Sequence, residues 1–501
     1  MYAAITSSAL VGTVGAPVTV EAHVGNGLPG FTIVGLPDEG CREARDRVRA
    51  ALLSSGLQWP NRRITVNLAG SGERKGGAAM DLAIAVGLLV AQGIVPEDAV
   101  RGTAFIAELG LDGSLRPTEG IAPRVASLRE HEVIVAPSSV AEAQLARPPR
   151  LRTVSTLIEL VAVLAHGEPW PDVQAPVPAI ECDPVPDLSD VRGQEMARVA
   201  LEVAAAGFHH ILMIGPPGAG KSMLARRLPG LLPRLTDDEA FASAMARSAA
   251  GLALSASVTT SPPFRSPHHS ISLVGMVGGG SSIIRPGELT IATHGVLFLD
   301  EMGEFAPSVL DALRQPLEEG VVHISRAGTS LSMPAKCLLV AASNPCPCGG
   351  GEPGRCSCAP GSIEKYLRRF SGPILDRFDL RIGLARPSTD ELTGSAPGES
   401  TSIVATRVAR ARRIALERQG CLNSRIPAES LDEHAPVTPS AMKWLRARLD
   451  EGNLSGRGYH RLRRVARTLC DLADADDVID SHYVESAAMM RIDVVPRRRQ
   501  F

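Results

Sequence analysis

The chain has 501 residues, of which 44% are hydrophobic and 21% charged, as in a globular protein of two to four domains. A formal net charge of −2 excludes a protein that coats nucleic acid through a uniformly basic surface, so any such contact must come from local patches. No apolar stretch is as long as a membrane span, and no basic region precedes an apolar block near residue 1. We therefore expect a cytoplasmic protein without a membrane partner, and its nine cysteines fit a reducing compartment.

The first predicted domain spans residues 1–166 and mixes strands with helices. Residues 63–68 alternate apolar and polar side chains, as a half-buried strand does, and residues 79–90 are typical of a helix of small apolar side chains. The proline-rich stretch 167–186 predicts a linker, because proline removes backbone hydrogen-bond donors. The second domain is therefore expected to begin at residue 187.

A nucleotide-phosphate motif lies early in this second predicted domain, residues 187–386. The pattern G-x-x-x-x-G-K-[ST] stands between an apolar run at 211–214, expected to be a strand, and a helix expected to start near Lys221. A chance match in a Gly/Pro-rich turn is the alternative, but strand, loop and helix occur in the order that the motif requires. Its glycines let backbone N–H groups reach phosphate oxygens, its lysine supplies a charge, and its hydroxyl binds Mg²⁺. The predicted nucleotide-binding residues are Gly215, Pro216, Pro217, Gly218, Ala219, Gly220, Lys221 and Ser222.

Two further apolar runs end in polar residues. The run at 296–299 is followed by Asp300 and Glu301, and the run at 337–343 is followed by Asn344. Buried parallel strands have this composition, and ligands sit at their carboxyl ends. Asp300 is predicted to hold Mg²⁺, directly or through water, and Glu301 to polarise the attacking water. Asn344 is expected to orient that water or contact the γ-phosphate, with a simple turn before a proline as the alternative. Alternating strands and helices predict a doubly wound α/β sheet.

Four of the nine cysteines form two close C-x-C pairs separated by a Gly-rich loop. Two such pairs on flexible backbone can surround one tetrahedral Zn²⁺ ion. The spacing is tighter than the common C-x-x-C, so reduced loop thiols and a redox pair stay open as alternatives. The predicted ligands of a structural zinc site are Cys346, Cys348, Cys356 and Cys358.

The last predicted domain, residues 403–501, is helical and follows a second Pro/Ser/Gly/Thr-rich linker at 387–402. Residues 404–418 and 460–472 carry apolar side chains at helical spacing, with arginines between them. These helices are expected to form a lid that closes over the nucleotide.

Together these motifs resemble those of magnesium-chelatase-like AAA+ ATPases, specifically the competence-protein ComM (YifB) family. The resemblance also rests on the stretches 190–195, 264–270, 344–349 and 374–379, and it runs over nearly the whole chain. It implies three domains: a Lon-protease-like (S5 domain 2-like) α+β domain, a P-loop AAA+ core with a doubly wound parallel sheet, and a C-terminal helical lid.

The same resemblance assigns an arginine finger to Arg377. A guanidinium there would reach the γ-phosphate held by the neighbouring subunit and stabilise charge in the transition state. A local salt bridge to Asp376 or Asp379 is the alternative. Because the finger acts between subunits, the resemblance implies a ring, and we expect a homo-hexamer.

The family's second sensor, an arginine that touches the nucleotide from the lid, matches Arg461. Other arginines share this helix, so Arg464 stays open as an alternative. Val191 and Gln194 match positions that the family places near adenine.

The Lon-like resemblance of the first domain does not imply peptidase activity. A Lon-type peptidase needs a serine nucleophile activated by a lysine. The nucleophile position falls on Ala78 or Ala79 and the lysine position lies near Ala122, while Ser71 and Lys75 are out of register. We expect a structural or protein-binding domain.

Two insertions in the core bear on the substrate. By resemblance, residues 264–289 form a hairpin inserted into a core helix, and a second hairpin begins at 321–326. Such hairpins line the central pore of related rings, so Arg285 and Arg326 are candidates to grip a phosphate backbone. A salt bridge at the subunit interface is the alternative for Arg326, and the histidine pair at 268–269 is interpreted as a turn element.

The predicted function is ATP hydrolysis that drives a ring along single-stranded or branched DNA. By resemblance this is helicase or branch-migration work in transformation or recombination, with recombination proteins as further partners. The ATPase prediction depends on residues of this chain, whereas the DNA prediction depends on family analogy. Two other functions stay open: a magnesium-chelatase motor subunit that drives Mg²⁺ into a tetrapyrrole, and a protein-remodelling ATPase that acts through the N-terminal domain.

Overall fold

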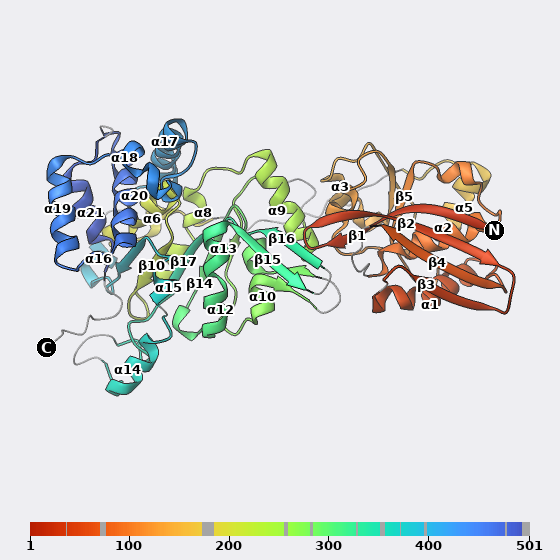
Figure 1. Cartoon of the computed structure of the whole chain (residues 1–501), viewed down its shortest axis with the longest axis horizontal. Helices are drawn as coiled ribbons and strands as arrows, with labels where there is room; N and C mark the ends of the chain where they lie inside the picture. The colour runs from red at the N-terminus through yellow and green to blue at the C-terminus, as the bar shows by residue number, and fades with distance from the viewer. Residues whose placement is uncertain are drawn as a thin grey trace.

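The chain folds into three parts that lie in a row (Figure 1): an N-terminal α+β domain, a central α/β domain and a C-terminal helical bundle. Within the described residues, no helix combines the length and apolar character that a membrane span requires. The computed structural model describes residues 1–36, 38–70, 77–172, 185–254, 259–280, 284–326, 329–350, 356–370, 372–394, 398–475 and 478–492.

A seven-stranded sheet in the order β3-β4-β2-β1-β5-β8-β9 forms the N-terminal domain. Strands β1 and β2 pair antiparallel along their whole length, and β4 continues this pairing beyond β2, whereas β5, β8 and β9 run parallel to one another. The predicted strand at 63–68 is confirmed as β4. The strands are β1 (Tyr2–Val11), β2 (Val14–Gly25), β3 (Gly30–Val34), β4 (Arg63–Gly70), β5 (Thr103–Ile106), β8 (Glu132–Val135) and β9 (Arg150–Thr153).

Helix α2 packs against β1 and β2 and is the predicted small-residue helix of this domain. Ala79 and Ala122, which match catalytic positions of a peptidase, are buried with 1% and 0% exposure. Ser71 and Lys75 lie outside the described residues, and likeness to a Lon domain stays a prediction. The helices are α1 (Glu39–Ser54), α2 (Asp81–Ala91), α3 (Ile121–Ala126), α4 (Val140–Gln144) and α5 (Leu157–His166), and β6 (Glu108–Leu109) pairs with β7 (Leu115–Arg116).

The central domain is built on a five-stranded sheet in the order β11-β14-β17-β10-β18, and all its neighbours pair in parallel. This confirms the predicted parallel α/β sheet. Consecutive residues face opposite sides: Ile211 and Met213 belong to one core, and Leu212 belongs to the other. The strands are β11 (Phe264–Arg265), β14 (Val296–Leu299), β17 (Leu338–Ser343), β10 (Ile211–Ile214) and β18 (Leu380–Gly383).

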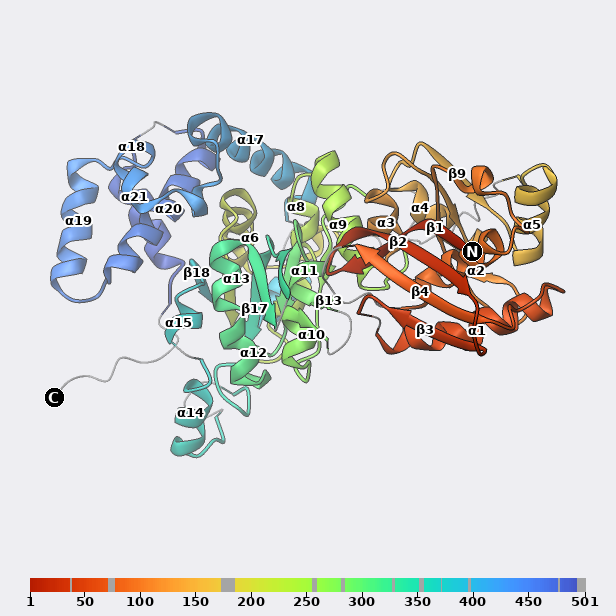
Figure 2. The same cartoon turned by 45° about the vertical axis from the view of Figure 1, so that its right-hand side comes forward.

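Helices cover both faces of this sheet. One core includes side chains of α6 and of the C-terminal helices, and the other includes side chains of α12, α13 and α15. Helix α14 projects away from the sheet in both views (Figures 1 and 2). The helices are α6 (Glu195–Gly207), α7 (Lys221–Ala225), α8 (Leu228–Leu231), α9 (Asp237–Ala249), α10 (Leu273–Val277), α11 (Glu288–Ile291), α12 (Pro307–Ala312), α13 (Arg314–Glu319), α14 (Pro360–Leu367) and α15 (Gly372–Leu375).

Two hairpins are inserted in the central domain, as the sequence predicts. The first pairs β12 (Gly278–Gly279) with β13 (Arg285–Pro286), and the second pairs β15 (Val321–Arg326) with β16 (Thr329–Pro334). The N-terminal domain contacts both: Glu119 forms an ion pair with Arg285 at 2.6 Å, and Leu331 of β16 packs against Gly12.

The N-terminal domain also docks on helix α9 through helix α3. Ala122 packs in a small apolar cluster with Ala244 and Met245. The N–H group of Ala122 donates to Ser248 Oγ at 3.3 Å, and this hydroxyl donates in turn to Glu142. A position that matches a peptidase lysine therefore lies in the interface between the two domains.

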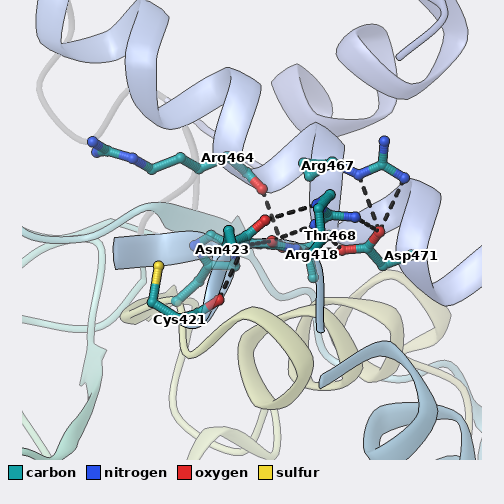
Figure 3. A network of polar contacts seen from close by, with 9 residues as sticks. Arg418, Cys421, Asn423, Arg464, Arg467, Thr468 and Asp471 are labelled. Carbon is teal, nitrogen blue, oxygen red and sulfur yellow. Dashed lines mark hydrogen bonds and ion pairs between the residues drawn. The ribbon is translucent and has the colours of Figure 1, made fainter. Parts of the chain in front are cut away.

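The C-terminal bundle is helical, and it begins two residues before the predicted boundary. The predicted linker at 387–402 contains helix α16. A buried polar network ties α17 to α20: Arg418 and Asn423 both donate to Asp471, at 2.7 Å each, and Asn423 also donates to Thr468 (Figure 3). The helices are α16 (Thr389–Gly394), α17 (Thr401–Gln419), α18 (Leu431–His434), α19 (Pro439–Asp450), α20 (Gly456–Ala473) and α21 (Ser481–Met489).

Candidate nucleotide site

The predicted phosphate loop connects β10 to α7 at the carboxyl edge of the central sheet. Gly218 and Gly220 have φ angles of +80° and +88°, a region that side chains with a Cβ rarely adopt, so this loop needs glycine at both positions. Lys221 Nζ donates to the carbonyl oxygens of Gly215 at 2.6 Å and Pro216 at 3.0 Å. Burial lowers the pKa of Lys221, and the nearby carboxylates of the site oppose this shift.

The ends of β14 and β17 bring the other predicted residues to the loop. Ser222 Oγ donates to Asp300 Oδ2 at 2.8 Å, and Lys221 Nζ donates to Asn344 Oδ1 at 3.1 Å. The carboxyl ends of three neighbouring strands therefore place an ammonium, a hydroxyl, a carboxylate and an amide in one site. Glu301 follows directly, with a φ of +52° that few non-glycine residues adopt.

His269 reaches this site from the first insertion, which the sequence did not indicate. Its Nδ1 lies 3.6 Å from Glu301 Oε2, and its ring packs edge-on against Phe305. The neighbouring His268 keeps the predicted turn role, since its Nδ1 lies 2.8 Å from Ser270 Oγ. The only available signal was the position of the pair just after β11, the strand that neighbours β14.

The residues matched to adenine contacts lie on the other side of the phosphate loop. Gln194 Nε2 donates to the carbonyl oxygens of Ala219 at 3.3 Å and Ala385 at 2.6 Å, so it ties the loop to the end of β18. Val191 is fully buried in the core. Arg386, which the sequence did not indicate, donates to the carbonyl of Pro217 at 3.0 Å. Contact of Val191 or Gln194 with adenine stays a prediction.

Arg377 and Arg461 lie at the opposite, amino-terminal edge of the sheet. They line one cavity of about 420 Å³, together with His210, which precedes β10, and Asp379, which precedes β18. Arg377 pairs with Glu318, and not with either aspartate considered in the sequence. Its buried Nε makes no hydrogen bond within the described part of the chain.

Asp376 is contacted from α20 by Arg457, whose guanidinium lies 3.7 Å away, and by Arg461. The guanidinium of Arg461 lies 3.6 Å from Asp376 and 3.4 Å from Asp379, beside the same cavity. Arg464 also lines the cavity, but its Nε donates to the carbonyl of Ile426 at 2.8 Å. Arg461 and the phosphate loop of the same chain lie at opposite edges of the sheet, and contact of Arg461 with a nucleotide stays a prediction.

A buried hydrogen-bonded path links this second edge to the helical bundle. His209 Nδ1 lies 2.9 Å from Asp379 Oδ2, and His209 Nε2 lies 2.8 Å from Thr468 Oγ1. Burial alone would raise the pKa of Asp379, but the hydrogen bond and charge of His209, with His210 and Arg461, lower it. Asp379 is thus held as a carboxylate between two arginine-bearing elements.

The four cysteines of the C-x-C pairs meet near Asn344. Their sulfur atoms lie within 4.8 Å of one another, and Cys346 Sγ lies 3.4 Å from Cys348 Sγ and 3.6 Å from Cys356 Sγ. A tetrahedral zinc site with Zn–S bonds of about 2.3 Å has S···S distances of about 3.8 Å. The cluster therefore has the ligand type and the size that a metal ion requires.

The two arginines predicted to contact DNA differ in what can be described. Arg285 is paired with Glu119 of the N-terminal domain, which the sequence did not suggest. Arg326 ends strand β15, but its side chain lies outside the described residues, and its role stays a prediction.

Comparison with known proteins identifies the family. Models described as "Magnesium chelatase, subunit ChlI", "Subunit ChlI of Mg-chelatase" and "Magnesium chelatase, subunit ChlI C-terminal" match residues 187–392, 20–139 and 398–491. Competence protein ComM of Haemophilus influenzae is 40% identical over 500 residues, which cover 98% of each chain. The chain belongs to the ComM/YifB family.

Other relatives place this member in a wider group. The uncharacterized protein YifB of Escherichia coli is 39% identical over 492 residues, which cover 98% of this chain and 97% of the relative. A shorter match, to DNA replication licensing factor MCM3 of Entamoeba histolytica, is 24% identical over 195 residues, 39% of this chain and 28% of the relative. Family membership and the parallel α/β sheet together support an AAA+-like protein that binds ATP.

Proposed function

We propose that this ComM/YifB-family chain is an ATP-hydrolysing ring motor that moves along DNA. The observation that carries the proposal is the division of ATPase groups between two edges of one sheet. Lys221 and Asp300 stand at the carboxyl edge, whereas Arg377 and Arg461 stand at the amino edge and line a cavity of about 420 Å³. Two copies placed edge to edge would complete one site.

In the proposed reaction each residue of the carboxyl edge has one task. Lys221, whose amine now binds loop carbonyls, exchanges them for the outer phosphates of ATP. Glu301 accepts a proton from the attacking water, and Asn344 orients that water. Ser222 and Asp300 are the residues that would hold Mg²⁺, which neutralises charge on the phosphates.

The amino edge of the neighbouring copy supplies the remaining positive charge. Arg377 is the finger for the γ-phosphate, and Arg461 joins it from the helical bundle of the same copy. The pair cannot serve the phosphate loop of its own chain, because the sheet lies between them. This arrangement favours a closed ring, and we propose a homo-hexamer in the cytoplasm.

The proposal that DNA is the substrate is supported by the names of two relatives and by two arginines of this chain. A relative over nearly the full length carries the name competence protein, and a partial relative is a DNA replication licensing factor. Arg285 and Arg326 lie on the two inserted hairpins and are candidates for phosphate contacts with single-stranded or branched DNA. Recombination proteins are proposed as further partners.

We also propose that the four cysteines hold Zn²⁺. The support is that the four sulfur atoms lie within 4.8 Å of one another, close enough to surround one ion, and that structural Zn²⁺ sites often have four cysteine ligands. A structural ion would join residues 346–350 to residues 356–358, two stretches that form no helix or strand.

The proposed function is tested by ATP turnover of the purified chain without polymer and with single-stranded, duplex and forked DNA. We expect hydrolysis that DNA accelerates and that Lys221→Ala abolishes. A well-folded sample that assembles no ring with ATP, and releases no phosphate under any of these conditions, would contradict the proposal.

A magnesium-chelatase motor is the second candidate, because three matching family models are described as magnesium chelatase. It ranks lower, because the chain carries a cysteine cluster that such a motor would not need. A tetrapyrrole-dependent ATPase assay with chelatase partner subunits distinguishes the two: stimulation by tetrapyrrole and not by DNA would favour the chelatase.

A further inference from the structure

The four-cysteine turn, defined here as residues 346–350 with Cys356 and Cys358, lies next to the candidate nucleotide site. Its first cysteine, Cys346, follows Asn344 by two residues, and the side-chain amide of Asn344 accepts from Lys221 Nζ. Any movement of the turn is therefore transmitted over a short stretch of chain to a group that contacts the phosphate-binding lysine.

The turn also packs directly on the phosphate loop. Gly349 has a φ of +76°, and a Cβ added to it would lie 2.6 Å from Cδ of Pro217. The loop and the turn are two walls of one cavity of about 780 Å³, which Gly215, Pro216 and Pro217 line from one side and Pro345, Cys348 and Gly349 from the other. The close approach works only because residue 349 has no side chain.

Helix α14, which follows Cys358, braces the site from the other side. The Tyr366 hydroxyl donates to the carbonyl of Asn344 at 3.1 Å and packs on Gly303, two residues after Glu301. Arg369, just beyond the helix, donates to the carbonyl of Gly303 at 2.7 Å. The four-cysteine turn thus contacts the phosphate loop, and the helix that follows it contacts Asn344 and the turn that carries the catalytic carboxylate.

We propose that the metal ion bound by the four cysteines holds one wall of the ATP pocket, so that metal occupancy sets ATP affinity. The proposal rests on the proposed function, since it assigns control of the same nucleotide site. Loss of the ion releases the two ends of the turn from each other. The contact of Gly349 with Pro217 then loosens, and ATP must order the loop when it binds.

The experiment uses the full chain and has two arms. In the first, metal content is measured by elemental analysis before and after treatment with a zinc chelator, and ATP Kd is measured by calorimetric titration in both states. We expect one Zn²⁺ per chain, a Kd about tenfold weaker after chelation, and recovery on adding Zn²⁺.

The second arm leaves the cysteines intact. Gly349→Ala places a methyl group against Pro217 and should weaken ATP about fivefold while metal content stays at one ion. Gly361→Ala is the matched control, because a Cβ there meets nothing within 4 Å. Circular dichroism verifies that both variants fold, and the chelation arm stands if Gly349→Ala does not.

The outcomes separate this inference from the proposed function. Absence of bound metal even with added Zn²⁺, or an ATP Kd that chelation leaves unchanged, overturns the inference while ATP hydrolysis by the wild type still supports the motor. A wild-type chain that contains metal but neither binds nor hydrolyses ATP overturns the proposed function, and the inference with it.

Discussion

The two edges of the central sheet differ in how their charged groups are held. At the carboxyl edge Lys221 contacts Asn344 and two loop carbonyls, and the groups come from the start of α7 and from the residues just after β14 and β17. At the amino edge Arg377 and Arg461 come from separate domains and meet carboxylates in an open cavity. Under the proposed function, one edge binds phosphates and the other supplies Arg377 and Arg461 to the site of a neighbouring copy.

Removing the phosphate-binding charge should have the largest effect. Lys221→Ala leaves the loop without its ammonium group, so we expect no measurable ATP binding and no turnover. Equilibrium titration with a fluorescent ATP analogue checks binding. Lys443→Ala, an exposed lysine of α19, is the control and should behave as the wild type. Wild-type affinity in Lys221→Ala would remove the basis of the comparison.

Removing the opposite edge should separate binding from chemistry. Arg377→Ala is expected to lower ATP turnover about 10³-fold while ATP Kd stays unchanged, because the arginine acts on the neighbour's nucleotide. Mixing Arg377→Ala with Lys221→Ala tests this directly. Mixed rings contain interfaces with one intact edge from each variant, so part of the activity should return. Two inactive variants that stay inactive when mixed would argue against a shared site.

Glu301→Gln keeps the shape of the carboxyl edge but removes its base. We expect ATP binding to be retained and turnover to fall about 10²-fold. Steady-state phosphate release, measured together with the ATP Kd, separates the effect on turnover from the effect on binding. Normal hydrolysis in this variant would contradict the assignment of the base.

The arginines of α20 should differ from each other by a smaller factor. Arg461→Ala is expected to lower turnover about tenfold, equal to about 1.4 kcal/mol of transition-state stabilisation, because Arg461 stands beside Arg377 in the cavity. Arg464→Ala should act mainly on stability, since its Nε bonds to a main-chain carbonyl. Turnover measured at saturating ATP, beside a thermal melt, distinguishes the two. The reverse ranking would move the sensor role to Arg464.

The smallest effect concerns pH and the amino edge. Burial lowers the pKa of His210 to about 4, and its Nδ1 accepts from the N–H of Leu339 at 3.1 Å, which requires a neutral ring. The unfolded chain takes up this proton below its ordinary pKa of about 6.5, so stability should fall as pH drops from about 6.5 towards 4, by at most about 3 kcal/mol. The free energy of unfolding, measured by denaturant titration at several pH values, checks this. In His210→Asn, which lacks the titrating ring, it should depend less on pH. An equal slope in both chains would exclude His210 as the cause.

The carboxyl edge could be predicted from the sequence because its parts are local. A glycine-rich loop, apolar strands and the residues that follow them are each short patterns, and parallel pairing brings the strand ends together. Lys221, Ser222, Asp300 and Asn344 therefore meet as expected.

The amino edge and the insertions could not be predicted in this way. The side of the sheet that Arg461 faces depends on the path of the chain through the bundle, which no short pattern encodes. The contact of His269 with Glu301 depends on how an irregular insertion folds back over β14. Likewise, the burial of Ala122 against α9 joins segments more than 100 residues apart, and small apolar residues carry no mark of their partner.

The ion pair between Arg285 and Glu119 affects how any DNA binding would respond to ionic strength. A phosphate that binds Arg285 must displace the carboxylate of Glu119. The released carboxylate then attracts a cation from solution. Counterion release from the polymer is partly cancelled, so this arginine should add less than the usual slope of about 0.9 per phosphate to a plot of log affinity against log salt. Through this ion pair, the N-terminal domain would make the contribution of Arg285 to DNA affinity less sensitive to salt than that of an unpaired, exposed arginine.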